Sequence, residues 1–180
     1  MDDKTREEKK EVLKKQLEES LKKEPDAPDL NHSKSQEEAR QILQPYYNIV
    51  ENALKRMEIN PEESRGEDAG QWNLRNGNAT VWVDVWYLAE EKMPYFQVIA
   101  PIMTTPDKKL EEFYAEILKI NYTLFEVAFS LLEDGVYLKN VKEAFDLTEE
   151  QVIFSINRCG FYADYYNDKL IKRFGGKRIE

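Results

Sequence analysis

The stretch from Gln71 to Met103 constrains the fold more than any other part of the sequence. It holds three strand-like runs, which are separated by Asn76-Gly77 and by residues 89–93. Both central residues of a type I′ turn need a positive φ angle. Asn and Gly tolerate that angle, so this dipeptide is typical of a tight hairpin. We therefore predict an antiparallel three-stranded meander as the centre of the fold.

Alternation of side chains assigns the two faces of the meander, because successive residues of a strand point to opposite sides. One side of the second strand is small and branched, and we expect helices to cover it: Ala79, Val81, Val83 and Val85. The opposite side is mixed and is expected to be half-exposed. It carries Thr80, Trp82, Asp84 and Trp86 on the second strand, and Tyr95, Gln97 and Ile99 on the third.

A capping box formed by Ser35 and Glu38 predicts the start of a helix before the meander. The helix is amphipathic, because its apolar residues recur at helical spacing: Ile42, Tyr46, Ile49, Val50, Ala53, Leu54 and Met57. Either the helix kinks at Pro45, or a first short helix stops near Leu43 and a second begins with Pro45 in its first turn. After it, residues 62–70 are expected to form an acidic loop without core residues.

Two further helices and two further strands complete the predicted fold. Pro101 is expected to close the third strand. The remaining segments are a helix opened by residues 105–107 and running to about 122, strands at 125–131 and 136–140, and a helix from 147 to 174 that Gly175-Gly176 ends. We predict an α+β fold: a two-layer sandwich of an antiparallel five-stranded sheet with helices on one face (α-β-β-β-α-β-β-α), plus an extra N-terminal charged helix.

The sequence before residue 35 differs in character from the rest. Residues 3–24 are mostly helix formers with closely interleaved charges and a narrow apolar stripe, and residues 24–33 read as a linker with two prolines. The helix is either solvated or docks weakly on a partner. We therefore divide the chain into a charged helical extension and linker (1–34), a folded domain (35–176) and a short tail (177–180).

Composition narrows the range of functions. The chain has 26 Lys and Arg against 35 Asp and Glu, a net charge of −9, which disfavours binding to nucleic acid or to anionic membranes. No apolar run is long enough for a transmembrane helix, and the first residues do not resemble a signal peptide. Cys159 is the only cysteine, so no internal disulfide can form. These features predict a cytoplasmic protein.

The sequence offers no residues for a catalytic, cofactor-binding or metal site, so we predict that the protein is not an enzyme and uses no cofactor. The only histidine, His32, lies in the linker, and no Ser-His or Cys-His pair is plausible. Zinc ligands with suitable spacing and a glycine-rich phosphate loop are both missing. Cys159 lies among apolar residues at helical spacing and is expected to be a buried structural thiol.

The mixed face of the meander is the candidate binding surface. Aromatic residues are frequent contacts at interfaces, and an acid between two tryptophans would give such a surface a polar group. The predicted protein-binding residues are Trp82, Asp84, Trp86, Tyr95 and Ile99. The alternative is that this face is simply half-exposed and that Asp84 keeps it soluble. A second aromatic group, Tyr162, Tyr165 and Tyr166, is interpreted as helix packing rather than as a ligand site.

Several segments together resemble a known family. They are WNLRNGNATVWVDV, FQVIAPI, FYAEILKINYTLFEVAFSL and a closing tyrosine-bearing helix that ends in FGG. Over roughly residues 37–176 the chain resembles the YbjN-like family, which shares the fold of bacterial type III secretion chaperones. The charged extension before residue 35 departs from that family, as does the segment 141–145, where a proline is common.

The resemblance implies a protein without enzymatic activity or cofactor. The secretion chaperones are small, acidic, cytoplasmic and usually homodimeric, and they hold segments of a client protein in extended form. We therefore expect a non-catalytic protein-binding module, chaperone-like or regulatory, whose partner lies on the sheet face or adds to a strand edge. The alternative is a self-associating homodimer without an external client, joined through the same face or the final helix. A small-molecule-binding domain is the third possibility.

Overall fold

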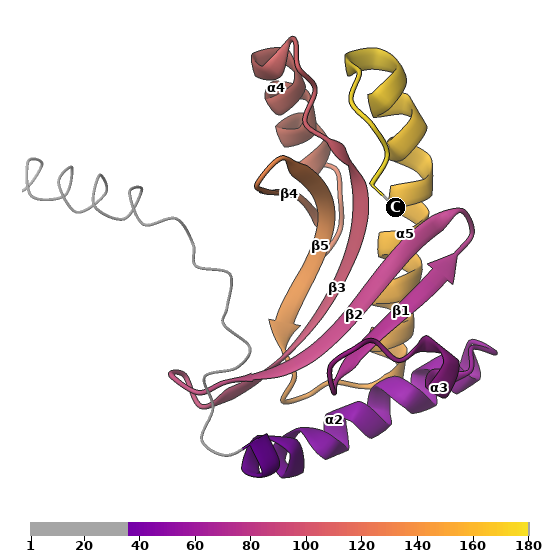
Figure 1. Cartoon of the computed structure of the whole chain (residues 1–180), viewed down its shortest axis with the longest axis vertical. Coiled ribbons are helices and arrows are strands. Elements are labelled where there is room, and N and C mark those ends of the chain that lie inside the picture. The colour runs from indigo at the N-terminus through magenta and orange to yellow at the C-terminus, as the bar shows by residue number, and fades with distance from the viewer. Residues whose placement is uncertain (1–35, 180) are drawn as a thin grey trace, which may run out of the picture. The chain divides into compact units, whose positions relative to one another are not determined.

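A single antiparallel sheet of five strands, in the order β1-β2-β3-β5-β4, is the frame of the fold (Figure 1). The computed structural model describes residues 36–179, so the predicted N-terminal helix lies outside the described residues. The elements in chain order are α2 (Gln36–Arg56), α3 (Pro61–Ser64), β1 (Gln71–Asn76), β2 (Ala79–Leu88), β3 (Met93–Thr104), α4 (Leu110–Asn121), β4 (Ala128–Leu132), β5 (Gly135–Glu143) and α5 (Glu149–Phe174).

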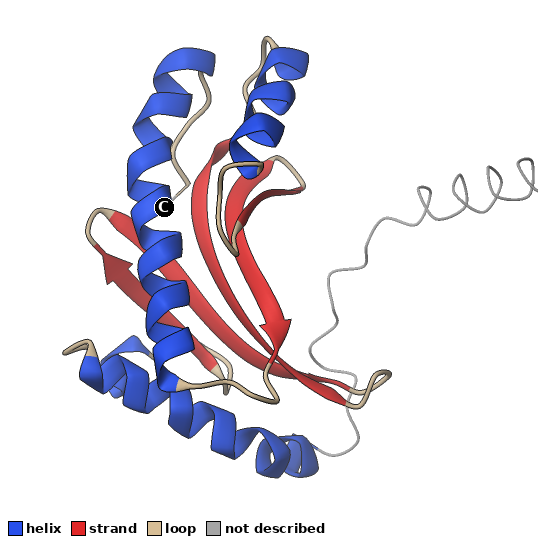
Figure 2. Ribbon diagram, turned by 180° about the vertical axis from the view of Figure 1, so that it is seen from behind, coloured by secondary structure: helices blue, strands red, loops and turns tan. Residues whose placement is uncertain are grey.

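The predicted α+β fold is confirmed, with the helices on one face of the sheet. Figure 2 shows α5 lying across the sheet and α2 crossing below it. The inward residues of the strands are fully buried beneath these helices, and they include Val81, Val83, Phe96, Val98 and Leu138. Side-chain alternation therefore assigned the two faces of the meander correctly, because only the small and branched face can bury its apolar area against α5.

Helix α2 runs through Pro45 as one helix, so the alternative of two separate helices is wrong. Its buried side includes Leu43 and Tyr47, whereas Ile42 is 45% exposed. The prediction that Ile42 belongs to the buried side is wrong, whereas Tyr46 packs against the core as expected and the buried Leu43 and Tyr47 were not predicted. Apolar and aromatic residues occupy both members of each neighbouring pair, so the helical period alone does not select the buried one.

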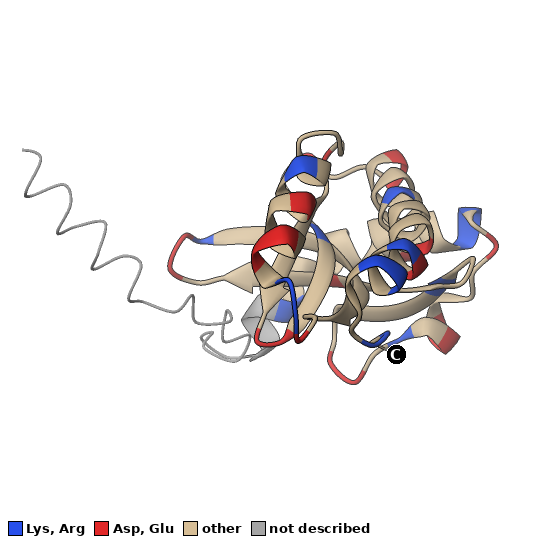
Figure 3. Cartoon of the chain, turned by 90° about the horizontal axis from the view of Figure 1, so that it is seen from above, with Lys and Arg blue, Asp and Glu red and all other residues tan. Residues whose placement is uncertain are grey.

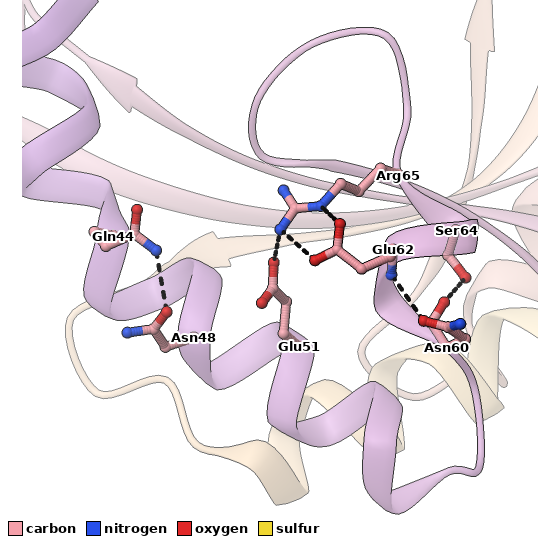
Figure 4. Close-up of polar contacts among 7 residues, drawn as sticks. All are labelled: Gln44, Asn48, Glu51, Asn60, Glu62, Ser64 and Arg65. Carbon is pink, nitrogen blue, oxygen red and sulfur yellow. Dashed lines mark hydrogen bonds and ion pairs between the residues drawn. The ribbon is translucent and has the colours of Figure 1, made fainter.

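The predicted loop at residues 62–70 contributes no side chain to the hydrophobic core, as expected, but its first residues are helical rather than a loop. The segment Pro61–Ser64 forms the one-turn helix α3, with Pro61 and Ser64 buried. Asn60 begins it by accepting a hydrogen bond from the Glu62 amide at 3.1 Å (Figure 4). Arg65 then joins this turn to α2 through its ion pair with Glu51 at 2.6 Å (Figure 4).

Strand β3 continues past Pro101 to Thr104, so the prediction that Pro101 closes the strand is wrong. The pairing of β3 with β5 shifts between Pro101 and Met103, and β2 is paired with β3 only as far as Ile99. A proline is tolerated at such an irregularity because the missing N–H is not needed there. Beyond this point the C-terminal residues join β3, with Met103 bridged to Arg178.

The last helix has the predicted ends. Thr148 and Gln151 exchange hydrogen bonds in a capping box, and Gly175 follows the helix with a φ of 87°. Cys159 is fully buried and lies 3.8 Å from the Val98 carbonyl, as expected for a structural thiol. Helix α4, by contrast, begins at Leu110 rather than at residues 105–107, after Lys109 in the left-handed conformation without a side-chain cap.

Candidate functional site

The face of the sheet opposite α5, which we call the open face, gathers all five residues predicted to bind protein. It is turned toward the viewer in Figure 1, with α5 behind it. The register of β2 and β3 sets Trp82 opposite Ile99, Asp84 opposite Gln97, and Trp86 opposite Tyr95. The sheet itself therefore places these side chains in three adjacent rows, and each of them is half-buried.

Two aromatic pairs flank the centre of the open face. Trp86 and Tyr95 stack with ring centroids 5.7 Å apart and an interplanar angle of 20°. Trp82 lies 6.2 Å from the ring of Tyr137 on β5. Such pairs are worth about 0.5–1.5 kcal/mol beyond the area that they bury, so they hold the rings in fixed positions. The open face is thus a preformed surface rather than a set of independent side chains.

Tyr137 is a residue of this face that sequence reasoning did not name. Its neighbours Val136 and Leu138 are buried, so alternation along β5 alone places Tyr137 on the opposite side. What the sequence does not show is that β5, rather than β4, pairs with β3. This strand order brings Tyr137 opposite Pro101 and within contact of Trp82.

Asp84 is the acidic residue in the middle row of the open face. Its Oδ2 accepts a hydrogen bond from Gln97 Nε2 at 3.0 Å. Partial burial raises the pKa of Asp84 above its ordinary value, while the Gln97 hydrogen bond and the positive charge of Lys139 act in the opposite direction. The carboxylate is therefore held by one amide in a poorly hydrated position.

Tyr95 is fixed at the rim of the open face by Glu91 in the β2–β3 turn. The Tyr95 hydroxyl donates a hydrogen bond to the Glu91 carboxylate. This bond, together with the nearby negative charge, raises the pKa of Tyr95. Tyr95 therefore stays neutral at physiological pH and presents its ring to Trp86.

A second group of exposed apolar side chains lies on α4, on the edge strand β4 and on the segment between them. It consists of large apolar side chains that stay in contact with solvent, and we call it the α4–β4 surface: Leu118, Tyr122, Phe125, Leu131 and Leu132. Leu118, Tyr122 and Phe125 are 67%, 93% and 70% exposed. The Asn121 side chain accepts a hydrogen bond from the Phe129 amide at 2.7 Å and so ties α4 to β4.

The tyrosines of α5 divide between packing and exposure. Tyr166 packs edge-on against Phe129 at 5.7 Å, and Tyr162 also lies against the core, in agreement with the packing interpretation. Tyr165 is instead exposed beside Phe161, and Lys169 lies over its ring. The packing interpretation therefore holds for two of the three residues.

A polar pocket of about 280 Å³ lies between the β1–β2 hairpin, α5 and the C-terminal residues. Its polar lining comes from Arg75, Asn78, Thr80, Asp164, Asn167 and Arg178. None of the five predicted contact residues lines it. Asn167 has a structural task there, because its Nδ2 donates to the Ile102 carbonyl at 2.9 Å, where β3 has left β2.

Residues 36–179 give little support for a metal site or for nucleophilic catalysis. No cluster of three or more His, Cys, Asp or Glu side chains in this range could hold a metal ion. Burial raises the pKa of the Cys159 thiol to about 12, which makes it a poor nucleophile. None of the described helices is both long and apolar enough to cross a membrane. Lys and Arg are interspersed with Asp and Glu along the helices and turns (Figure 3).

The open antiparallel sheet with helices on one face is the architecture of secretion chaperones. A chain of the crystal structure of the ExsC–ExsE complex superposes with a TM-score of 0.54 at 16% identity, over 72% of this chain and 96% of that one. A chain of the HopA1–SchA chaperone–effector complex superposes with a TM-score of 0.51 at 11% identity, over 68% and 93%. At these identities the likeness concerns the fold.

The sequence profile of one family matches residues 45–180, which is more than half of the chain. The protein belongs to this family, TY-Chap1, described as the T3SS (YopN, CesT) and YbjN peptide-binding chaperone 1. The resemblance to YbjN-like proteins and type III secretion chaperones is thereby confirmed. No curated protein sequence matches the chain.

Proposed function

We propose that this protein is a chaperone-like module that binds an extended segment of a partner protein on its open face. The observation that carries the proposal is the set of half-buried aromatic side chains held in register across β2, β3 and β5. A solvated sheet face normally carries polar residues, and exposed apolar groups of this size favour an interaction site. The family's description as peptide-binding chaperones supports the same function.

The contacts that we assign to the partner are Trp82, Asp84, Trp86, Tyr95 and Ile99, together with Tyr137. Trp and Tyr lose little side-chain entropy on binding and bury large areas, which suits them to this task. Because Trp86 stacks on Tyr95 and Trp82 lies against Tyr137, the rings need no rearrangement before a partner arrives. Such preorganisation lowers the cost of association.

Recovery of partners from the native host tests this function. The tagged full-length chain and its Trp82→Ala/Trp86→Ala variant are used in parallel, and the eluates are analysed by native mass spectrometry. A stoichiometric polypeptide that binds the wild type and is lost from the variant supports the open face. Phe154→Ala is the matched control, because Phe154 is an aromatic residue 61% exposed on α5. A partner that is retained by the folded double variant contradicts the assignment.

A second candidate function, self-association, is favoured by the α4–β4 surface. Leu118, Tyr122 and Phe125 come from the end of α4 and the segment after it, and Leu131 and Leu132 come from the edge strand β4, which β5 separates from β3. Two copies joined through this surface would form an isologous homodimer and leave the open face accessible. Sedimentation at micromolar concentration tests it: Leu118→Ser/Tyr122→Ser converts a dimer to a monomer, whereas Trp82→Ala/Trp86→Ala does not. A wild-type monomer at this concentration excludes the homodimer.

A further inference from the structure

The side of β2 that faces the open face combines an acid with two indoles. Trp82, Asp84 and Trp86 are alternate residues of β2, so all three side chains leave the sheet on the same side. Asp84 has one hydrogen-bond donor among residues 36–179, the Gln97 amide. A carboxylate can accept about four hydrogen bonds, so most of its capacity remains for a partner.

The charged side chains around Asp84 do not neutralise it. Lys139 on β5 lies in the next row, opposite Ile99, and is close enough to influence the Asp84 carboxyl. No ion pair joins Lys139 to Asp84 within the described part of the chain. Glu143, opposite Tyr95, adds a second negative charge to this side of the sheet. Among the described residues, the Asp84 carboxylate therefore lies between the two aromatic pairs without an ion-pair partner, with Lys139 in the next row.

This arrangement suits a cation. Lys and Arg are attracted to the faces of Trp and Tyr rings, and the attraction adds to that of a poorly hydrated carboxylate. Arg fits best, because its planar guanidinium can stack on an indole while it donates two hydrogen bonds to a carboxylate. Trp82 and Trp86 flank Asp84 on both sides and would exclude water from the contact.

The spacing along β2 also restricts the neighbours of that cation. Side chains on one face of a strand repeat every two residues, or roughly 6.8 Å. An extended partner segment has the same repeat. If its basic residue lies on Asp84, the residues two positions before and after it lie over Trp82 and Trp86, where apolar side chains bury the most area.

We infer that the partner segment carries an arginine or lysine that pairs with Asp84, with apolar residues two positions to each side that contact Trp82 and Trp86. This inference rests on the proposed function and specifies the chemistry of the segment that the open face binds. Asp84 is a specificity residue in this arrangement, and the tryptophans supply most of the contact area.

Fluorescence anisotropy with three end-capped synthetic peptides tests the inference on the full-length protein. Each peptide has two leucines separated by three residues, threonines beside them, and Arg, Gln or Glu at the centre. We expect the Arg peptide to bind about tenfold more tightly than the Gln peptide, and the Glu peptide to bind more weakly than both. In Asp84→Asn the Arg and Gln peptides bind equally. Asn is isosteric and can still accept from Gln97, so folding is retained.

Glu143→Gln is the matched control, since it removes the other acid next to the aromatic residues and is expected to keep the Arg preference. The inference is overturned if Asp84→Asn keeps that preference, if Glu143→Gln alone abolishes it, or if no peptide binds. Equal binding of all three peptides to the wild type, lost in Trp82→Ala/Trp86→Ala, also overturns it. That last result would leave the proposed function of the open face intact.

Discussion

Gln97 donates a hydrogen bond from its Nε2 to Oδ2 of Asp84 at 3.0 Å, and the two residues are directly opposite each other on β2 and β3. The amide compensates only part of the hydration that the carboxylate loses in this position. Asp84 consequently has a raised pKa, and its charge at neutral pH is a local cost to the fold. Residues at recognition sites commonly carry such a cost.

Replacement of Asp84 by Asn should make the protein more stable at pH 7. The pKa of Asp84 is higher in the folded chain than in the unfolded one, so its contribution to stability is greatest below the unfolded pKa and falls as pH rises through the folded pKa. We expect Asp84→Asn to gain about 0.5–1 kcal/mol at pH 7 and to lose this advantage in acid. Urea denaturation of both chains at several pH values measures it. A variant that is less stable than the wild type at pH 7 contradicts the prediction.

Trp72 should tolerate Phe much better than Ala. Its ring is 1% exposed and contacts Tyr47 edge-on at 5.9 Å, but its indole N–H is buried without a hydrogen-bond partner in the described part of the chain. Trp72→Phe removes that unpaired donor and loses part of the packing, so we expect a cost within about 1.5 kcal/mol. Trp72→Ala should cost about 3–5 kcal/mol. Chemical denaturation distinguishes the two, and equal costs would contradict the expectation that a phenyl ring keeps most of the packing at this site.

Gly160 on α5 should not accept alanine, although alanine favours helices by about 1 kcal/mol. A Cβ at Gly160 would lie 2.7 Å from both Cβ and Cγ of Asn76 in the β1–β2 hairpin. The hairpin cannot retreat freely, because Asn76 Nδ2 also donates to Asn157 Oδ1 at 3.0 Å. We expect Gly160→Ala to destabilise by about 1–3 kcal/mol in thermal unfolding.

A second substitution checks the cause of this effect. Asn76→Gly removes the side-chain atoms that a Cβ at residue 160 would meet, at the last paired position of β1. In the Asn76→Gly background, Gly160→Ala should therefore cost much less. Additive effects of the two substitutions would locate the strain elsewhere.

Cys159 should resist thiol reagents in the native protein. Burial raises its pKa to about 12, and its side chain is fully covered. Modification by an aromatic disulfide reagent at pH 8 should therefore proceed at the rate of unfolding and become fast in denaturant. Cys159→Ala, measured beside it, should destabilise by about 1 kcal/mol through lost packing. Rapid labelling of the native chain would contradict the burial of this thiol.

The meander was predictable because two local signals agree. The hairpin forms where the Asn-Gly signal predicts it, but its turn is one residue later than expected: Asn76 pairs with Ala79, and Gly77 has a positive φ of 61° whereas Asn76 does not. Strict alternation on β2 separates Val83 and Val85 from Asp84 and Trp86. The five candidate contact residues therefore come together as the sequence predicts. Their role in binding a partner stays a prediction, because it depends on the chemical groups of that partner.

The predictions from the sequence fail where tertiary contacts, rather than local patterns, determine the structure. Leu43 is buried and Ile42 is exposed, and Tyr47 is buried beside the partly buried Tyr46, because α5 and the sheet select the rotation of α2. Pro101 remains inside β3 because β2 has already diverged there. Tyr137 joins the open face because β5 pairs with β3, and no local pattern in the sequence encodes that strand order.

The divergence of β2 from β3 also leaves the end of β3 free to pair with the C-terminal residues. Beyond the last residues of β3 that pair with β2, the Thr104 amide donates to the Lys177 carbonyl at 2.8 Å. The Lys177 amide in turn donates to Thr104 Oγ1 at 3.1 Å. These last residues occupy a backbone edge that would otherwise be open to another chain. The C-terminal residues thus protect this part of β3 from pairing with a strand of another molecule. Removal of residues 176–180 would expose the edge and is expected to promote aggregation.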